Sequence, residues 1–134
     1  MIDFQHINTE IPSFNSEFFI SSITKLINEE KKVLGDITVI FVTDEHLLVM
    51  NKEYLNHDYY TDIITFDFCE RNIVSGDLFI SLDRVKENAS IFNVDFMNEL
   101  QRVVIHGVLH LCGYKDKTVE EETKMRELEN KYMN

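Results

Sequence analysis

The 134-residue sequence has no tryptophan, one proline, four glycines and two cysteines, and these shortages exclude several classes of protein. Two cysteines, Cys69 and Cys112, are too few for a disulfide-stapled secreted domain and are not spaced as a CxxC metal clip. We expect both to be buried as small apolar residues. No stretch rich in proline, glycine or serine suggests a linker, repeat or low-complexity segment, so we expect a single domain over residues 1–134.

The sequence also lacks a long hydrophobic run and an excess of positive charge. No segment approaches the roughly 18 consecutive apolar residues of a membrane-spanning helix, and the first residues do not form a secretion signal. We therefore expect a cytoplasmic protein that does not bind membranes. The formal net charge of −11 disfavours sequence-independent binding to DNA, because phosphate contacts supply most of that affinity. A small phosphate-binding cleft is compatible with this charge.

The hydrophobic pattern predicts strands mixed with helices. Alternation and β-branched residues indicate strands near residues 2–7, 37–43, 62–68 and 73–81, the last two resembling a hairpin. Helical spacing indicates helices near residues 12–34, 44–54, 83–92, 95–113 and from 118 onward. Gly35 occupies the stop position of the first helix, and Phe66 and Phe68 are expected in the core. The predicted fold class is α+β, with a mixed four-stranded sheet and about five helices.

The strongest chemical signal lies in segment 106–116. His106 and His110 are four residues apart in a predicted helix, so both imidazoles project from one face and reach one ion. Gly113 ends that helix, and Asp116 follows with an oxygen ligand. The spacing H-x3-H-x2-G-x2-D has the layout of the metzincin metalloproteases, with Asp as the third ligand. We predict one catalytic zinc ion on these three residues, with an open fourth position.

Two other interpretations of this segment remain. In one, the two histidines are ordinary helix residues and Asp116 is a solvated turn residue; their helix face is otherwise apolar, however, and a buried imidazole pair needs partners. In the other, the metal serves a peptidase or amidase. Gly107 argues against this activity, because the metalloproteases have a general-base glutamate at the corresponding position.

Segment 106–116 resembles the H-G-x-L-H-L-x-G-Y-D-H motif of the YbeY family of endoribonucleases, bacterial maturation factors for ribosomal RNA. Residues 61–66 (TDIITF) and 76–81 (GDLFIS) are similar to two strand motifs of that family, in the same order. The resemblance implies a zinc-dependent hydrolase of single-stranded RNA that processes the 3′ end of small-subunit ribosomal RNA and takes part in ribosome quality control. The implied partners are ribosomal RNA, the small subunit and its assembly factors.

The sequence departs from the family pattern at the metal motif and before the first strand motif. Asp116 stands where the family has its third histidine, and Lys115 where it has an aspartate. Carboxylate binds zinc, but the charge of the site falls by about one unit and metal preference shifts toward harder ions. Leu55 stands where the family has an arginine. We therefore expect the substrate to contact Arg102, Lys115 or His57, and a non-catalytic ribosome-assembly factor with a structural metal is the alternative.

The expected reaction is metal-assisted hydrolysis of an RNA phosphodiester. Zinc held by His106, His110 and Asp116 lowers the pKa of bound water to about 7, so that water is the nucleophile and no glutamate base is needed. Asp62 and Asp77 either line the cleft or hold strand ends through backbone hydrogen bonds, and the second role is favoured. The net charge of −11 opposes the approach of RNA, so we expect the ribosome to deliver the substrate.

Overall fold

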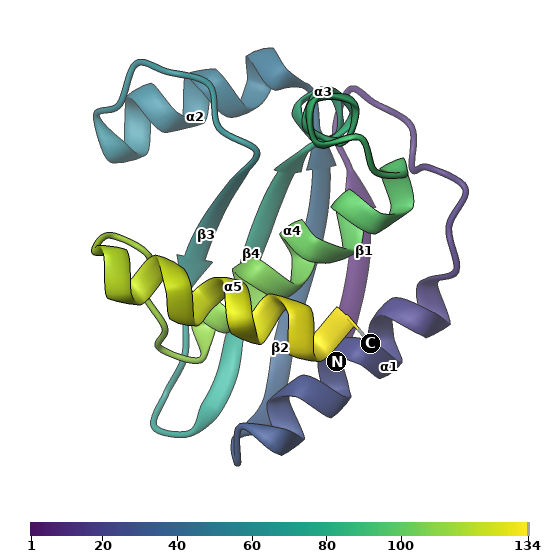
Figure 1. Cartoon of the computed structure of the whole chain (residues 1–134). Coiled ribbons are helices and arrows are strands. Elements are labelled where there is room, and N and C mark those ends of the chain that lie inside the picture. Colours follow the sequence, from purple (N-terminus) through teal and green to yellow (C-terminus); the bar gives the residue numbers. More distant parts are fainter. Residues whose placement is uncertain (134) are drawn as a thin grey trace.

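A four-stranded sheet with helices on both faces forms the framework of the protein (Figure 1). The structure is a computed structural model that describes residues 1–133. The elements are β1 (Ile2–His6), α1 (Ser16–Glu29), β2 (Val33–Val42), α2 (Asp44–Leu55), β3 (Ile63–Asp67), β4 (Ile73–Ser81), α3 (Leu82–Phe92), α4 (Phe96–Leu111) and α5 (Val119–Met133).

The strands lie in the order β1-β2-β4-β3. Strands β1, β2 and β4 are parallel, whereas β3 and β4 form an antiparallel hairpin. The α+β class, the mixed four-stranded sheet and the hairpin predicted from the sequence are therefore confirmed. Among residues 1–133, no helix is long and apolar enough to cross a membrane.

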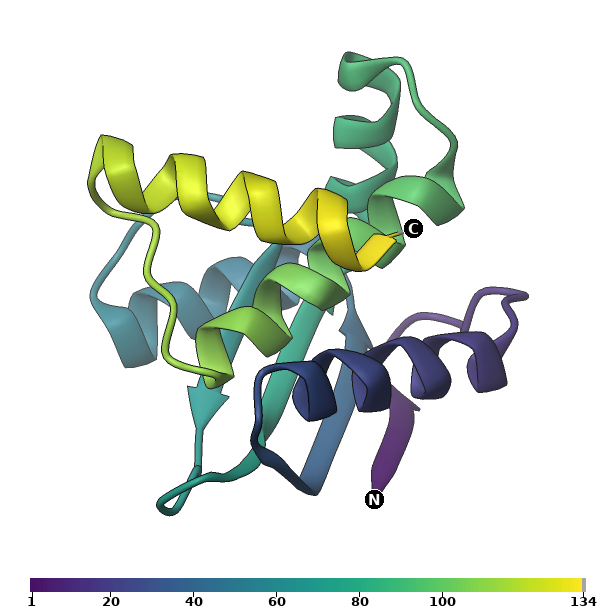
Figure 2. The same cartoon turned by 60° about the horizontal axis from the view of Figure 1, so that its bottom comes forward.

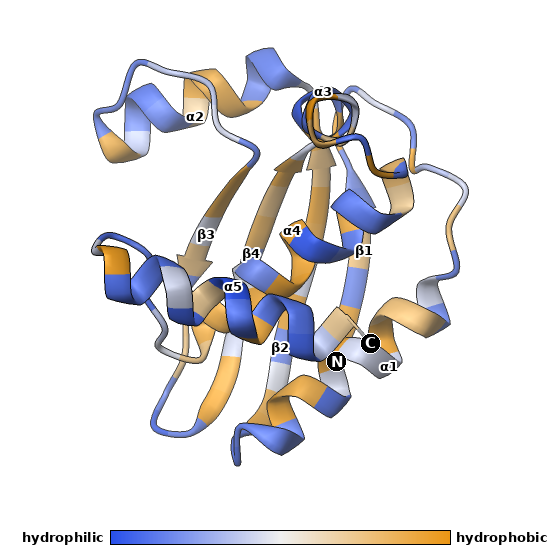
Figure 3. Cartoon of the chain, viewed as in Figure 1, coloured by the Kyte–Doolittle hydropathy of each residue, from blue (hydrophilic) through white to orange (hydrophobic). Residues whose placement is uncertain are grey.

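The two faces of the sheet carry two hydrophobic cores of different size. The larger core includes Phe41 of β2 and Leu78 of β4 and is covered by α1 and α4 (Figures 1 and 3). Helix α5 lies across the outer side of α4 and adds its own buried residues to this core (Figure 2). On the opposite face, Leu47 of α2 joins a smaller cluster with Ile40 and Ile64. Helix α4 is therefore held between the sheet and α5.

Helix α4 approaches the sheet closely at Gly107. A Cβ atom at this position would lie 2.7 Å from Cδ1 of Ile63 and 3.1 Å from Cδ2 of Leu78. A side chain at position 107 would therefore enter the contact between α4 and the sheet. A glutamate at this position would require the side chains of Ile63 and Leu78 to shift.

The first helix is shorter than the sequence predicts. It ends at Glu29, and Lys31 turns the chain with a φ of 60°. Gly35 does not stop the helix but lies within β2, where an added Cβ would be 2.1 Å from Oγ of Ser75. The glycine is therefore needed for the close approach of β2 to β4, a contact that local sequence does not reveal.

Two expectations about burial are also corrected. Phe68 follows β3 and is 60% exposed, whereas Phe66 packs against the smaller core as expected. Cys112 is buried, but Cys69 is only half-buried because it lies in the connection between β3 and β4. Both thiols are free.

Candidate metal centre

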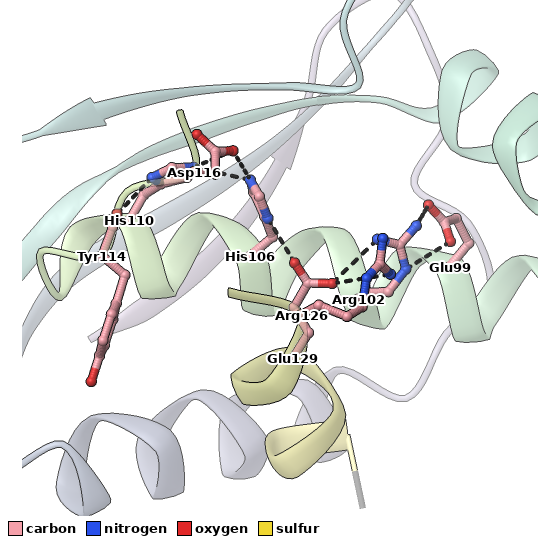
Figure 4. A network of polar contacts seen from close by, with 8 residues as sticks. All are labelled: Glu99, Arg102, His106, His110, Tyr114, Asp116, Arg126 and Glu129. Atoms are coloured by element: carbon pink, nitrogen blue, oxygen red, sulfur yellow. Dashed lines mark hydrogen bonds and ion pairs between the residues drawn. The ribbon is translucent and has the colours of Figure 1, made fainter. Parts of the chain in front are cut away.

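His106 and His110 project from one face of α4 toward the loop that joins α4 to α5 (Figure 4). Their Nε2 atoms lie 2.9 Å apart. Oδ2 of Asp116 lies 3.2 Å from Nε2 of His106 and 3.3 Å from Nε2 of His110. The fold thus brings together the three residues that the sequence singles out, with one possible ligand atom from each facing the same point.

The end of α4 explains how Asp116 reaches the two histidines. Gly113 adopts a φ of 104°, a conformation that residues with a side chain rarely take. Its N–H donates to the carbonyl of His110, and the N–H of Tyr114 donates to the carbonyl of Leu109. These bonds terminate the helix and turn the chain back, so that Asp116 faces the last turns of α4.

Hydrogen bonds fix the orientation of both imidazoles. Nδ1 of His110 donates to the carbonyl oxygen of Tyr114 at 2.9 Å, and Nδ1 of His106 donates to Oε2 of Glu129 at 2.8 Å. Since each Nδ1 carries the proton, each Nε2 presents a lone pair. Two such lone pairs and a carboxylate oxygen at this separation repel one another unless a proton or a metal cation lies between them. The donor set therefore fits a transition metal such as zinc.

Glu129 comes from α5 and is 2% exposed. Its Oε1 accepts from Arg102 at 3.3 Å and lies 3.5 Å from Nη1 of Arg126. Burial alone would raise the pKa of Glu129, but the hydrogen bond from His106 and the charges of His106, Arg102 and Arg126 hold that pKa below its ordinary value. For His106, burial acts to lower the pKa, and the bond to Glu129 raises it above the ordinary value. The sequence gives one sign of this role, because Glu129 falls on the buried stripe of α5.

A cleft extends to both sides of the candidate ligands. His106, Asp116 and Asp62 line both parts of it. The part toward β3 and α2 also includes Leu55, Thr61, Ile63, Ile64, Thr65, Asp67, His110 and Lys117. The part toward α5 also includes Arg102, Val103, Glu122, Met125, Arg126 and Glu129. Burial raises the pKa of Asp62, and the charges of His106 and Arg102 oppose this increase.

The proposed substrate-contacting residues lie in different surroundings. Arg102 lines the cleft, but its guanidinium is already paired with Glu99 and Glu129, which are both buried. Lys115 is exposed in the α4–α5 loop, and His57 is exposed and stacks on the ring of Tyr59 with centroids 5.1 Å apart. Neither Lys115 nor His57 is among the residues, within the described part of the chain, that form the two parts of the cleft.

Leu55 lines the cleft, whereas Asp77 lies on the other face of the sheet. Leu55 is 45% exposed and lines the cleft together with both histidines, so a side chain at position 55 is close to the candidate metal centre. Asp77 alternates with Leu78 on β4 and shares the strand face of Phe79, which packs on the α2 side of the sheet. Asp62 is therefore a residue of the cleft, whereas Asp77 is not.

Comparisons with known proteins show the family of the chain and support its fold. The family model described as endoribonuclease YbeY matches residues 1–134. The endoribonuclease YbeY of Azobacteroides pseudotrichonymphae is 46% identical over 125 residues, covering 93% of this chain and 90% of the relative. That of Porphyromonas gingivalis is 45% identical, covering 97% of this chain and 86% of the relative. The solution structure of TM1509 from Thermotoga maritima superposes with a TM-score of 0.70 at 30% identity, over 99% of this chain and 87% of that chain. The chain belongs to the endoribonuclease YbeY family.

Proposed function

We propose that this endoribonuclease uses one zinc ion, held by His106, His110 and Asp116, to cleave single-stranded RNA. The observation that carries the proposal is the convergence of two histidine Nε2 atoms and one carboxylate oxygen within 3.3 Å. We further propose that the substrate is the 3′ end of small-subunit ribosomal RNA, and that the enzyme takes part in ribosome quality control in the cytoplasm. A single domain over residues 1–134 performs this work.

We assign different roles in the reaction to the residues that line the cleft. When bound, the metal supplies a Lewis acid for the phosphoryl oxygen and lowers the pKa of water. His106 and His110 offer Nε2 because Glu129 and the Tyr114 carbonyl hold their Nδ1 protons. Asp62 lines both parts of the cleft beside His106 and Asp116, and we assign its carboxyl group to the exchange of a proton with the reacting oxygen atoms.

The charge of the cleft supports delivery of the substrate by the ribosome. Asp62, Asp67 and Asp116 line the part toward β3, where Lys117 is the cation among the described residues. In the other part, Arg102 is paired with two carboxylates, and Arg126 lies 3.5 Å from Oε1 of Glu129. Free RNA thus meets little positive potential and binds weakly, so in the cell a partner on the small subunit, either ribosomal RNA or an assembly factor, raises the local concentration of the strand at the cleft. Within the cleft we assign substrate contact to Arg102, with Lys115 and His57 at its margin.

A non-catalytic assembly factor with a structural metal is the second candidate. The presence of Leu55 in the cleft favours it, because leucine supplies no charge to a phosphate. A metal held by His106, His110 and Asp116 would still order the α4–α5 loop without any cleavage of RNA. The two candidates differ in whether the isolated, metal-loaded protein cleaves RNA.

Metal analysis combined with RNA cleavage tests the proposal. The wild-type protein should bind one zinc per chain and cut a single-stranded oligonucleotide but not its duplex form. His110→Ala should lose both properties. His46→Ala, which changes a histidine of α2 outside the cleft, is the matched control and should keep both. Zinc binding without cleavage would favour the assembly factor, and a wild-type protein that binds no metal would overturn the proposal.

A further inference from the structure

Glu129 divides its two carboxylate oxygens between different partners. Oε1 faces Arg102 at 3.3 Å and Arg126 at 3.5 Å, whereas Oε2 faces Nδ1 of His106 at 2.8 Å. The contact with the histidine is the shortest of the three. Oε2 therefore contacts the imidazole alone among these three partners, and the ion pairs of Oε1 with the arginines do not explain the position of Oε2.

The burial of Glu129 argues against a purely structural role, because burying a carboxylate costs free energy of folding. The carboxylate is 2% exposed, and taking a charge out of water requires compensation by well-placed partners. A hydrophobic side chain would fill the same place on the buried stripe of α5, beside Met125, Leu128 and Tyr132, without that cost. Arg102 compensates the charge of Glu129 on one side and that of buried Glu99 on the other. The network therefore fixes a negative charge beside Nδ1 of His106, on the side of the ring away from Asp116 (Figure 4).

The position of that charge matters for a ligand imidazole. A carboxylate that accepts from one ring nitrogen fixes the tautomer, the ring orientation and the basicity of the other nitrogen. Here the accepting group is on α5 and the ring is on α4, so the packing of the two helices sets the direction of Nε2. His110 receives the corresponding support from the backbone of its own loop, through the Tyr114 carbonyl.

We infer that Glu129 is a positioning residue of the metal centre, which holds His106 in the tautomer that presents Nε2 to the ion. Arg102 acts through Glu129, since it fixes the carboxylate in place. The inference rests on the proposed function, because it requires a metal on His106, His110 and Asp116. It makes α5 a part of the active centre although no ligand comes from that helix.

Zinc affinity and the tautomer of His106 test the inference. Zn²⁺ affinity is measured by competition with a chromophoric chelator for the wild type, Glu129→Gln, Glu129→Leu and the exposed α5 control Glu127→Gln. Glu129→Gln removes the charge and keeps an acceptor oxygen, and we expect about a tenfold loss of affinity. Glu129→Leu removes both, and the loss should approach about 100-fold. Glu127→Gln should equal the wild type.

Nitrogen NMR of the metal-free proteins gives a readout that a merely structural role would not move. The wild type should show His106 protonated at Nδ1, and Glu129→Leu should show a mixture of tautomers. If Glu129→Leu fails to fold by circular dichroism, Glu129→Gln carries the test alone. Unchanged zinc affinity in folded Glu129 variants, with a wild type that binds zinc, would overturn the inference and leave the proposed function intact. A wild type that binds no zinc would overturn both.

Discussion

At the scale of single residues, Asp116 sets the charge of the candidate metal centre. Replacing it by histidine would exchange a hard oxygen donor for a softer imidazole nitrogen and make the ligand set neutral. We expect Asp116→His to keep metal binding and to raise the ratio of Zn²⁺ affinity to Mn²⁺ affinity severalfold. Competition titrations with both ions measure this ratio.

Asp116→Ala provides the comparison for that substitution. It removes a ligand without replacing it and should weaken the binding of both ions. Unchanged affinity of both ions in Asp116→Ala would show that position 116 does not supply a ligand.

A substitution at Leu55 distinguishes the nuclease from the assembly factor. Phosphoryl transfer places charge on the non-bridging oxygens, and a positioned cation stabilises that charge. Since Leu55 lines the cleft beside both histidines, we expect Leu55→Arg to increase the cleavage of single-stranded RNA by about tenfold or more. Initial rates of oligonucleotide cleavage with saturating zinc measure the change.

Val49→Arg is the matched control for Leu55→Arg. Val49 is also an exposed apolar residue of α2, 52% exposed, and it lies outside the cleft. Equal gains from the two variants would attribute the effect to bulk charge. If neither variant cleaves RNA with metal bound, the assembly factor becomes the better explanation.

The sequence reveals the candidate ligands because their arrangement is local. Helical periodicity places His106 and His110 on one face of α4. Gly113 predicts the turn that brings Asp116 back toward them. Glu129 is different, since its place beside His106 depends on how α5 packs across α4. The pattern of buried positions in α5 marks Glu129 as unusual but does not name its partner.

At the scale of elements, Glu30 connects three parts of the fold. This residue caps the C-terminus of α1 and accepts from the hydroxyl of Tyr114, at 2.6 Å, and from the hydroxyl of Tyr132. It thereby ties α1 to the loop that carries Asp116 and to α5. Burial acts to raise the pKa of Glu30, but the two hydrogen bonds and the charges of Lys131 and Lys124 hold it below its ordinary value of 4.5.

The lowered pKa of Glu30 predicts a pH dependence of stability. A carboxyl group with a lower pKa in the folded state stabilises the fold above its unfolded pKa, near 4.5, and loses this effect as pH falls through the folded value. Glu30→Gln should therefore lower the free energy of unfolding by about 1 kcal/mol at neutral pH. Urea unfolding at several pH values should show this difference shrinking below pH 4.5.

Glu29→Gln is the control for this element-scale prediction. Glu29 is the exposed neighbour of Glu30 on α1, so its substitution changes the same charge without the tyrosine contacts. A difference between wild type and Glu30→Gln that grows as pH falls would contradict the assigned linkage.

Element boundaries were less predictable than element types, for physical reasons visible at Gly35. A glycine after a helical stripe is typical of a helix stop, and the local pattern gives no reason to expect otherwise. Its actual role is to let β2 pass close to Ser75 of β4, a residue distant in the chain. Such long-range contacts overrode the local signal there, whereas strands and helices with strong periodicity formed as expected.

At the scale of the whole molecule, the net charge of −11 limits what RNA binding can achieve. Lys117, Arg126 and Arg102 are the cations that line the cleft in the described part of the chain, and Arg102 is already paired. Each phosphate contact with a single strand contributes about −0.7 to the slope of log affinity against log salt. We expect a slope no steeper than about −2 for a short RNA, measured by fluorescence anisotropy over a salt series.

Lys117→Ala tests that slope. It should make the dependence shallower by about 0.7, the contribution of one phosphate contact. A wild-type slope steeper than about −4 would indicate an extended basic surface and would contradict delivery of the substrate by a partner.

The compact spacing of the candidate ligands also affects how the metal couples to folding. His106, His110 and Asp116 lie within eleven consecutive residues, so a denatured chain keeps a chelating segment of its own. An ion that binds both states stabilises the native one only through the ratio of the two affinities. That ratio depends on what the folded state adds, namely the helical alignment of the imidazoles and the anchors at Glu129 and Tyr114. A metal bound by these residues would therefore stabilise the fold by less than its native affinity suggests, and a newly synthesised chain would be able to bind an ion before α5 packs on α4.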